Sequence, residues 1–241
     1  MPDESVGTFP SLDTLNEAII SCDLCPRLRN HCKQIADEKR AAYREWDYWG
    51  KPVPGFGDPD ARLLIVGLAP AAHGANRTGR MFTGDSSGDW LYAALHKFGF
   101  ATRAESLSKD DGLKLLDCYI TAAAHCAPPD NKPTNDELES CRPYLTSEWL
   151  LLDEVEVVLA LGKIGFDSWL KALGWWDALD PRDRPQFSHG AETVLPDGTT
   201  LLSSYHPSRQ NTNTGRLTPK MWDEVFERAR RLVSGNGLPA C

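Results

Sequence analysis

A loop rich in small residues, GLAPAAHGANRTGRMFTGD, occupies positions 67–85 and ends close to an aromatic ring and a carboxylate. Its small residues include Gly67, Ala69 and Ala71. Such residues let the backbone approach a ligand closely, because they carry little or no side chain. Phe82 offers a flat apolar face and Asp85 a negative charge. Together they predict a site for a planar heterocycle that stacks on Phe82, with the adjoining sugar beside Asp85.

The same loop allows other interpretations. It contains neither GxGxxG nor GxxxxGK[ST], so it does not match a dinucleotide site or a P-loop. Asp85 would also suit the N-cap of a helix that starts at Ser86. His73 and Asn76 would either line the pocket or support the turn of the loop, since both residue types suit loop geometry.

Alternating strands and helices must position this loop. Apolar runs bounded by turn residues predict core strands at 62–66, 118–123, 155–161 and 201–205, with a short strand near 192–195. Amphipathic periodicity predicts helices at 12–21, 29–46, 88–98, 135–151, 164–173 and 219–233. We therefore expect one α/β domain over residues 1–241, with an N-terminal helical segment at about 11–46. Its architecture would be a three-layer α/β/α arrangement around a central, mainly parallel four-stranded sheet.

Polar loops follow three of the predicted strands. Besides 67–85, they are TAAAHCAPPDNKPT at 121–134 and SYHPSRQNTNTGRLT at 204–218. Ligands of parallel sheets bind outside the carboxyl ends of the strands. We therefore expect the three loops to converge on one site.

The chain carries seven cysteines. It has no run of about 18 apolar residues, and its N-terminus MPDESVGTFP lacks the basic and apolar regions of a signal peptide. We expect a cytoplasmic protein with no membrane segment. Thiols stay reduced in that compartment, which favours metal or cluster ligation over a disulfide framework, with unligated core thiols as the alternative.

The three loops and the cysteines resemble the motifs of the uracil-DNA glycosylase superfamily, specifically its family 5, the iron–sulfur-containing branch called type b. The resemblance extends from about Cys22 to the last predicted helix. It implies an enzyme that flips uracil out of double-stranded DNA and hydrolyses the N-glycosidic bond, leaving an abasic site and no covalent link to the protein. The alternatives are a damage-binding module without catalysis and an unrelated hydrolase with a structural zinc.

The resemblance also implies roles for single residues. Phe82 would stack on the flipped base, and Asp85 would orient the attacking water or stabilise the cationic sugar. N-glycosidic cleavage passes through an oxocarbenium-like transition state, which a nearby carboxylate stabilises. His206, in SYHPS, would donate a hydrogen bond to the pyrimidine O2 as negative charge builds there, for which a neutral imidazole suffices. A strand-end histidine bonded to the backbone is the alternative for His206.

The sequence departs from other branches of the superfamily in the second loop. Those branches place an asparagine just after the second strand, where this chain has Ala122, Ala123 and Ala124. A site without that amide rejects other bases poorly, and the resemblance implies broader substrates such as hypoxanthine and xanthine. The GQDPY motif of family 1 and the inserted basic loop of the crosslinking branch do not occur in the sequence, so we expect turnover.

Four cysteines coincide with the ligands that the family uses for a [4Fe–4S] cluster: Cys22, Cys25, Cys126 and Cys141. Four thiolates in two separated pairs also suit structural zinc, although the wide spacing of the second pair is unlike a zinc ribbon. We expect the cluster to tie the N-terminal segment to the loop after the second strand. Cys32, Cys118 and Cys241 remain, with Cys118 expected in the core.

The net charge of −8 does not favour a protein held mainly by DNA phosphates, so the distribution of charge matters more than the sum. Residues 61–84 and 199–220 contain basic residues and no acid. We expect phosphate contacts from Arg77, Arg80, Arg209, Arg216 and Lys220. The alternative is that these side chains merely solvate loops. We expect the protein to act as a monomer.

Overall fold

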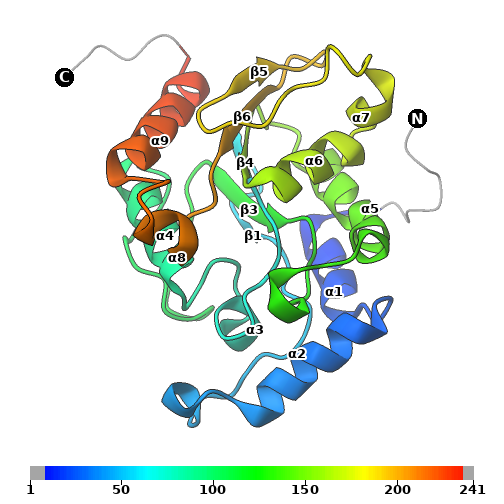
Figure 1. The fold of residues 1–241 in the computed structure, drawn as a ribbon, viewed down its shortest axis with the longest axis vertical. Coiled ribbons are helices and arrows are strands. Elements are labelled where there is room, and N and C mark those ends of the chain that lie inside the picture. Colours follow the sequence, from blue (N-terminus) through cyan, green and yellow to red (C-terminus); the bar gives the residue numbers. More distant parts are fainter. Residues whose placement is uncertain (1–8, 236–241) are drawn as a thin grey trace.

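The computed structural model describes residues 9–235, which form a six-stranded sheet with helices on both faces (Figure 1). The strand order is β1-β3-β2-β4-β6-β5. Four parallel strands form the centre: β3 (Cys118–Ala122), β2 (Leu63–Gly67), β4 (Val157–Leu161) and β6 (Thr200–Ser204). The antiparallel strands β1 (Phe56–Gly57) and β5 (Glu192–Val194) form the edges.

The mainly parallel sheet is confirmed, but the expected number of four strands is wrong. β1 is only two residues long, and β5, which confirms the short strand expected near 192–195, has three residues with exposed ends. Neither has enough buried apolar residues to produce a core-strand pattern. The ends of the expected 1–241 domain, including Cys241, lie outside the described residues.

Helices cover both faces of the sheet (Figure 1). One face packs against α4 (Ser86–Lys97) and α9 (Pro219–Val233), and the other packs against α1 (Leu12–Ser21), α5 (Asn135–Leu151) and α6 (Lys163–Ala172). Side chains of β2 alternate between the two cores, with Leu63 and Ile65 on the α4/α9 side and Leu64 and Val66 on the other. Burial on both faces explains why the parallel strands read as continuous apolar runs.

Capping residues set the helix boundaries that the sequence predicted best. Ser11 and Thr134 form capping boxes at the starts of α1 and α5, and Thr218 caps α9. The helix expected at 29–46 is instead α2 (Pro26–Glu38) followed by a short 3-10 helix, η1 (Ala41–Tyr43). Lys39 ends α2, because its backbone is left-handed, at φ +50°.

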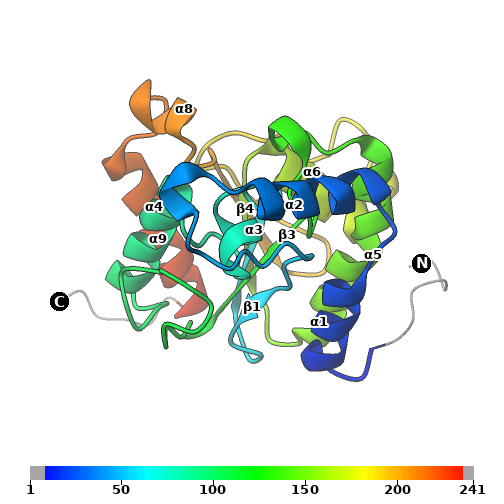
Figure 2. The ribbon, with the colours of Figure 1, turned by 90° about the horizontal axis from the view of Figure 1, so that it is seen from below.

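Short elements complete the described chain: α3 (Ala75–Thr78), η2 (Pro129–Asn131), α7 (Trp175–Ala178) and α8 (Arg209–Asn213). Figure 2 shows α2 lying across the molecule beside α3, with which it is in contact. Within residues 9–235, none of the helices is both long and apolar enough to cross a membrane.

The chain passes from β2 to β3 on one side of it and then crosses to β4 on the other side. β3 lies on one side of β2 and β4 on the other. In doubly wound sheets this reversal opens a crevice at the carboxyl ends of the strands. The loops that follow β2, β3 and β6 are therefore placed around a natural ligand site.

Candidate active site

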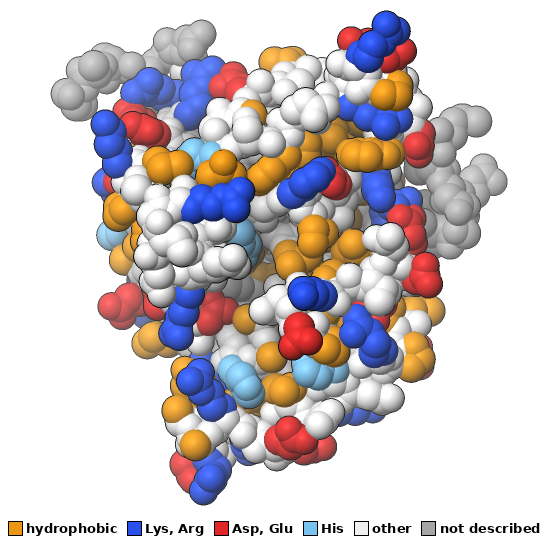
Figure 3. Space-filling model, viewed as in Figure 1, with side chains coloured by type: hydrophobic (Ala, Val, Ile, Leu, Met, Phe, Trp, Pro, Cys, Tyr) orange, Lys and Arg blue, Asp and Glu red, His pale blue; other side chains and the backbone are white. Residues whose placement is uncertain are grey.

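A cavity of about 510 Å³ lies where these loops meet. The loop after β2 contributes Ala69, Ala71, Phe82 and Asp85 to its lining. Asp130 and Asn131 line it from η2, His206 from the loop after β6, and Arg209 and Gln210 from α8. Figure 3, viewed as Figure 1, shows a hollow in this part of the surface, between α8 and the loop that follows β3. The predicted convergence of the three loops is confirmed.

Phe82 and His206 stack inside this cavity. Their ring centroids lie 5.8 Å apart with 27° between the ring planes. Phe82 has a left-handed backbone, at φ +53°, which is strained for an aromatic residue. Such strain persists only where the surroundings hold the residue in place, as they do at binding sites.

Two glycines make room for Phe82. A Cβ on Gly67 would lie 2.9 Å from the Phe82 ring, and a Cβ on Gly88 would lie 1.7 Å from the Phe82 carbonyl oxygen. Gly67 is not among the residues that line the cavity, so it supports the ring from behind. Its small size serves Phe82, whereas Ala69 and Ala71 border the cavity as expected.

Asp85 uses its two carboxylate oxygens differently. Oδ1 accepts hydrogen bonds from the backbone N–H groups of Ser87 and Gly88, at 2.9 and 3.0 Å, and so caps α4. Oδ2 lies beside Gly74, where a Cβ would be only 2.4 Å away. Asp85 is therefore both the helix cap that the sequence allowed and a cavity-lining carboxylate. Two backbone donors hold it in one orientation.

His206 is held through its backbone, and burial favours the neutral form of its ring. Asn211 donates a hydrogen bond to the His206 carbonyl at 2.8 Å. Burial lowers the pKa of the His206 ring, and the nearby Asp85 acts in the opposite direction without reversing the shift. A neutral imidazole can still donate one hydrogen bond.

The sequence prediction missed Asp130 and Asn131. Both have a left-handed backbone with φ +55°, and both line the cavity. Asp and Asn tolerate this conformation better than other non-glycine residues. The Pro128–Pro129 pair before them was the available signal, because consecutive prolines followed by Asp and Asn indicate a turn.

Arg77 and Arg80 do not lie on the surface, so the prediction that they contact DNA phosphates is wrong. Their exposed fractions are 4% and 3%. Arg80 forms a bidentate ion pair with Asp111, at 2.6 Å for the closer contact, and also donates to Ser106 and Thr83. These buried partners leave its charge unavailable to a ligand.

His73 and Asn76 support the loop and are not among the cavity-lining residues. Asn76 is fully buried and donates to the carbonyl oxygens of Cys32 and Ala72, both at 3.3 Å. The Nδ1 atom of His73 lies 3.2 Å from the hydroxyl of Tyr48. The expectation that these two residues line the pocket is therefore not met, and the alternative that they support the loop is favoured, because Asn76 bonds to Cys32 and His73 contacts Tyr48, both from distant segments.

The remaining three predicted phosphate contacts are exposed. Arg209 lines the cavity and donates to Ser86 at 3.2 Å. Arg216 lies over the ring of Tyr205, and Lys220 lies on the surface of α9. Their charges can reach a ligand outside the cavity.

Four cysteines surround a second, small cavity of about 20 Å³. They are Cys22, Cys25, Cys126 and Cys141, and all four are free thiols. Burial raises the pKa of the Cys141 thiol, and so do its three cysteine neighbours, while a hydrogen bond from the His125 backbone lowers it. No three His, Cys, Asp or Glu side chains among residues 9–235 are arranged to hold a single metal ion. Cys118 is buried in β3, as predicted.

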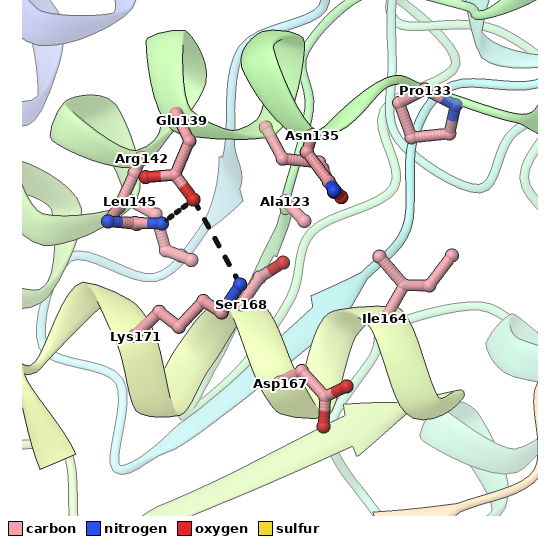
Figure 4. Close-up of a pocket in the computed structure, with 11 residues that line it drawn as sticks. Ala123, Pro133, Asn135, Glu139, Arg142, Leu145, Ile164, Asp167, Ser168 and Lys171 are labelled. Atoms are coloured by element: carbon pink, nitrogen blue, oxygen red, sulfur yellow. Dashed lines mark ion pairs between the residues drawn. The ribbon is translucent and has the colours of Figure 1, made fainter. Parts of the chain in front are cut away.

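A third cavity, of about 160 Å³, lies between α5 and α6 (Figure 4). Glu139 on its wall pairs with both Arg142 and Lys171. Asp167, also on its wall, pairs with Lys163. The charged groups of this cavity therefore have ion-pair partners, and it contains no predicted site residue. The larger cavity with Phe82, Asp85 and His206 is the candidate active site.

The fold and the cavity together define a doubly wound α/β protein with a ligand site at its topological switch point. Comparison with known proteins narrows this class. A sequence model of the uracil DNA glycosylase superfamily matches residues 54–230. The type-5 uracil-DNA glycosylase of Mycobacterium leprae is 49% identical over 228 residues, which cover 94% of this chain and 98% of that protein.

Other relatives agree. The type-5 uracil-DNA glycosylase of Thermus thermophilus is 50% identical over 217 residues, covering 90% of this chain and 96% of that protein. The type-4 uracil-DNA glycosylase of Pyrobaculum aerophilum is 30% identical over 164 residues, which cover 68% of this chain and 66% of that protein. The chain belongs to the uracil-DNA glycosylase superfamily and, within it, to the type-5 family.

Proposed function

We propose that this protein excises uracil from DNA by hydrolysing its N-glycosidic bond. The observation that carries the proposal is the placement of the Asp85 carboxylate in the same cavity as the stacked Phe82 and His206 rings. The cavity supplies an aromatic face for a base, a carboxylate for the sugar side of the bond and a polar ring for the departing base. The relatives named as uracil-DNA glycosylases support the same conclusion.

Asp85 acts on the sugar. As the bond to the base lengthens, positive charge develops on the sugar ring, and a fixed carboxylate stabilises it more than it stabilises the ground state. The α4 backbone donors hold Oδ1, so Oδ2 is the oxygen that remains to orient a water molecule for attack on the anomeric carbon. Hydrolysis then gives free uracil and an abasic site.

His206 and Asn131 act on the base side. Negative charge builds on the uracil oxygen as the base departs, and a neutral His206 can donate a hydrogen bond to it. Asn131 places a second polar group in the cavity, with one amide donor pair and one acceptor. Phe82 stacks on the base and fixes its plane.

The substrate is double-stranded DNA, bound by one copy of the chain. A base inside a duplex cannot reach a cavity of this kind, so the nucleotide must be flipped out, at a cost of a few kcal/mol that is least at mispairs. Uracil opposite guanine is therefore the easiest substrate. The DNA phosphates on either side of the flipped nucleotide would be held by the exposed side chains of Arg209, Arg216 and Lys220.

The pocket should also accept hypoxanthine and xanthine. Ala122, Ala123 and Ala124 are buried and are not among the residues that line the cavity, so this segment places no side-chain amide against the base. A volume of about 510 Å³ leaves room for a bicyclic base. Selectivity against these deaminated purines should be weak.

The four cysteines fit a [4Fe–4S] cluster. Each thiolate of such a cluster binds a different iron, so the thiols need not gather on one ion. A single zinc would need four thiolates at about 2.3 Å from one centre. When bound, the cluster would supply iron–thiolate bonds that join the end of α1, the start of α2, the loop after β3 and α5. Elemental analysis should find about four irons per chain and no zinc.

Purified protein incubated with end-labelled duplexes tests the activity. Duplexes that contain uracil, hypoxanthine or xanthine should yield alkali-labile abasic sites, and an undamaged duplex should not. Binding without cleavage, in protein with its full metal content, would identify a damage-binding module instead. Retention of Asp85 and His206 in one cavity argues against that alternative.

A further inference from the structure

Arg77 is a buried arginine whose partners in the described residues are two carbonyl groups and two aromatic rings. Its Nε donates to the His73 carbonyl at 2.8 Å, and its Nη2 donates to the Gly84 carbonyl at 3.0 Å. Its guanidinium carbon lies 3.9 Å from the ring centroid of Tyr43 and 4.1 Å from that of Trp46. Carbonyl oxygens and aromatic faces both stabilise a cation removed from water.

Gly84 is the residue directly before Asp85, and it is shaped to receive Arg77. It has φ +86°, and a Cβ at this position would lie 2.4 Å from the Arg77 Nη2 atom. The backbone of Gly84 therefore lies against the guanidinium. The Gly84 carbonyl that accepts this hydrogen bond belongs to the peptide unit that joins Gly84 to Asp85, and the Asp85 side chain lines the cavity.

The rings above Arg77 come from the segment that follows α2. We call Tyr43, Trp46 and Trp49 the aromatic cover. Trp49 donates its backbone N–H to the Arg77 carbonyl at 3.0 Å, and its ring packs on Gly79, where a Cβ would lie 3.0 Å from it. The aromatic cover thus fixes both the backbone and the side chain of Arg77.

We propose that Arg77 is a positioning residue that fixes Asp85 through the Gly84 carbonyl, and that the aromatic cover holds Arg77 in place for this purpose. The inference rests on the proposed function, because Asp85 must be the group that acts on the sugar. It assigns a role in catalysis to the segment 41–49, whose three cover residues are not among those that line the cavity. Displacing a catalytic group by about 1 Å can lower a rate on the order of 100-fold.

The central test is Arg77→Lys. Lysine keeps the positive charge but cannot span two carbonyl groups with a planar fork. We expect the single-turnover rate on uracil-containing duplex to fall at least about tenfold, with the dissociation constant of the DNA changed less than about twofold. The salt dependence of DNA binding should not change, because Arg77 does not contact phosphates.

Tyr43→Leu and Trp46→Leu test the aromatic cover without touching Arg77. Each should lower the single-turnover rate while DNA affinity and metal content stay as in the wild type. These two variants also decide the matter if Arg77→Lys does not fold. Arg231→Met is the matched control, because Arg231 is exposed on α9 and pairs with Glu227. It should keep the wild-type rate.

A wild-type rate in folded Arg77→Lys would overturn the inference, and so would wild-type rates in both leucine variants. A reduced salt slope in Arg77→Lys would mean a phosphate contact and would also overturn it. If the wild-type protein itself does not cleave uracil-containing DNA, the proposed function fails first. Crystal structures then show whether Asp85 Oδ2 moves in Arg77→Lys, and an unmoved Asp85 would still exclude the positioning role.

Discussion

The rings of Phe82 and His206 stack 5.8 Å apart, although Phe82 follows β2 and His206 follows β6. The two residues therefore meet only because the parallel sheet brings the carboxyl ends of its strands together. A flipped base that stacks on Phe82 comes into direct reach of the His206 ring. Phe82 and His206 therefore contact the base, whereas Asp85 acts on the sugar, and variants of these residues should have different effects on binding and on cleavage.

Phe82→Ala should weaken binding as well as cleavage. Stacking of a base on an aromatic side chain contributes about 1 to 3 kcal/mol, so affinity for uracil-containing duplex should fall on the order of tenfold or more. Fluorescence anisotropy measures this binding. Affinity for undamaged duplex is the control and should stay the same, because no base is flipped. An equal loss of affinity for both duplexes would show that Phe82 does not contact the flipped base.

Asp85→Asn should lower the rate and preserve binding. Asparagine also caps helices well, so α4 should keep its start while the negative charge is lost. We expect a single-turnover rate lower by about 10² to 10³, equivalent to about 3 to 4 kcal/mol of transition-state stabilisation. Thr218→Asn also places an asparagine at a helix N-cap, that of α9, and it should leave the rate intact. Wild-type cleavage of a U·G duplex by Asp85→Asn would show that Asp85 is only a helix cap.

The cleavage rate should fall on the acidic side of neutrality. Burial lowers the pKa of His206 from its ordinary value, which favours the neutral ring at pH 7. If the neutral ring is the active form, the single-turnover rate is constant near pH 7 and declines as pH falls through the lowered pKa. His206→Gln should be slower and should lose this decline. His96→Gln, at an exposed position of α4, should retain it.

Arg209, Arg216 and Lys220 should each contribute to the salt dependence of DNA binding. Removing one phosphate contact should lower the slope of log affinity against log salt concentration by about one. Titrations at several salt concentrations with the three alanine variants measure it. If a variant keeps the wild-type slope of log affinity against log salt concentration, the substituted residue does not contact a phosphate.

Cys141→Ala should lose the metal and much of the folded protein. Metal binding is coupled to folding in such sites, so the variant should be colourless, poor in iron or insoluble. Wild-type protein should absorb near about 400 nm, as iron–sulfur proteins do. Cys118→Ala is the control, because Cys118 is buried in β3 away from the four-cysteine cavity, and it should keep its iron. A soluble and fully metallated Cys141→Ala would exclude Cys141 as a ligand.

Local patterns determined most of the secondary structure and the position of the cavity. The helices at 12–21 and 135–151 occur as predicted, because their capping residues and apolar periodicity act within a few residues of each other. The parallel order of the strands follows from the helices between them, and it brings the loops with Phe82, Asp85 and His206 to one edge of the sheet.

Only the tertiary structure decided which polar residues of the first loop face a ligand. Arg77, Arg80 and Asn76 look like exposed loop residues, but their partners Tyr43, Asp111 and Cys32 come from segments about 30 or more residues away. Asn131 enters the cavity through a left-handed turn that the sequence only hinted at. A side chain is buried or exposed according to contacts that the chain makes across long separations, and local periodicity does not contain that information.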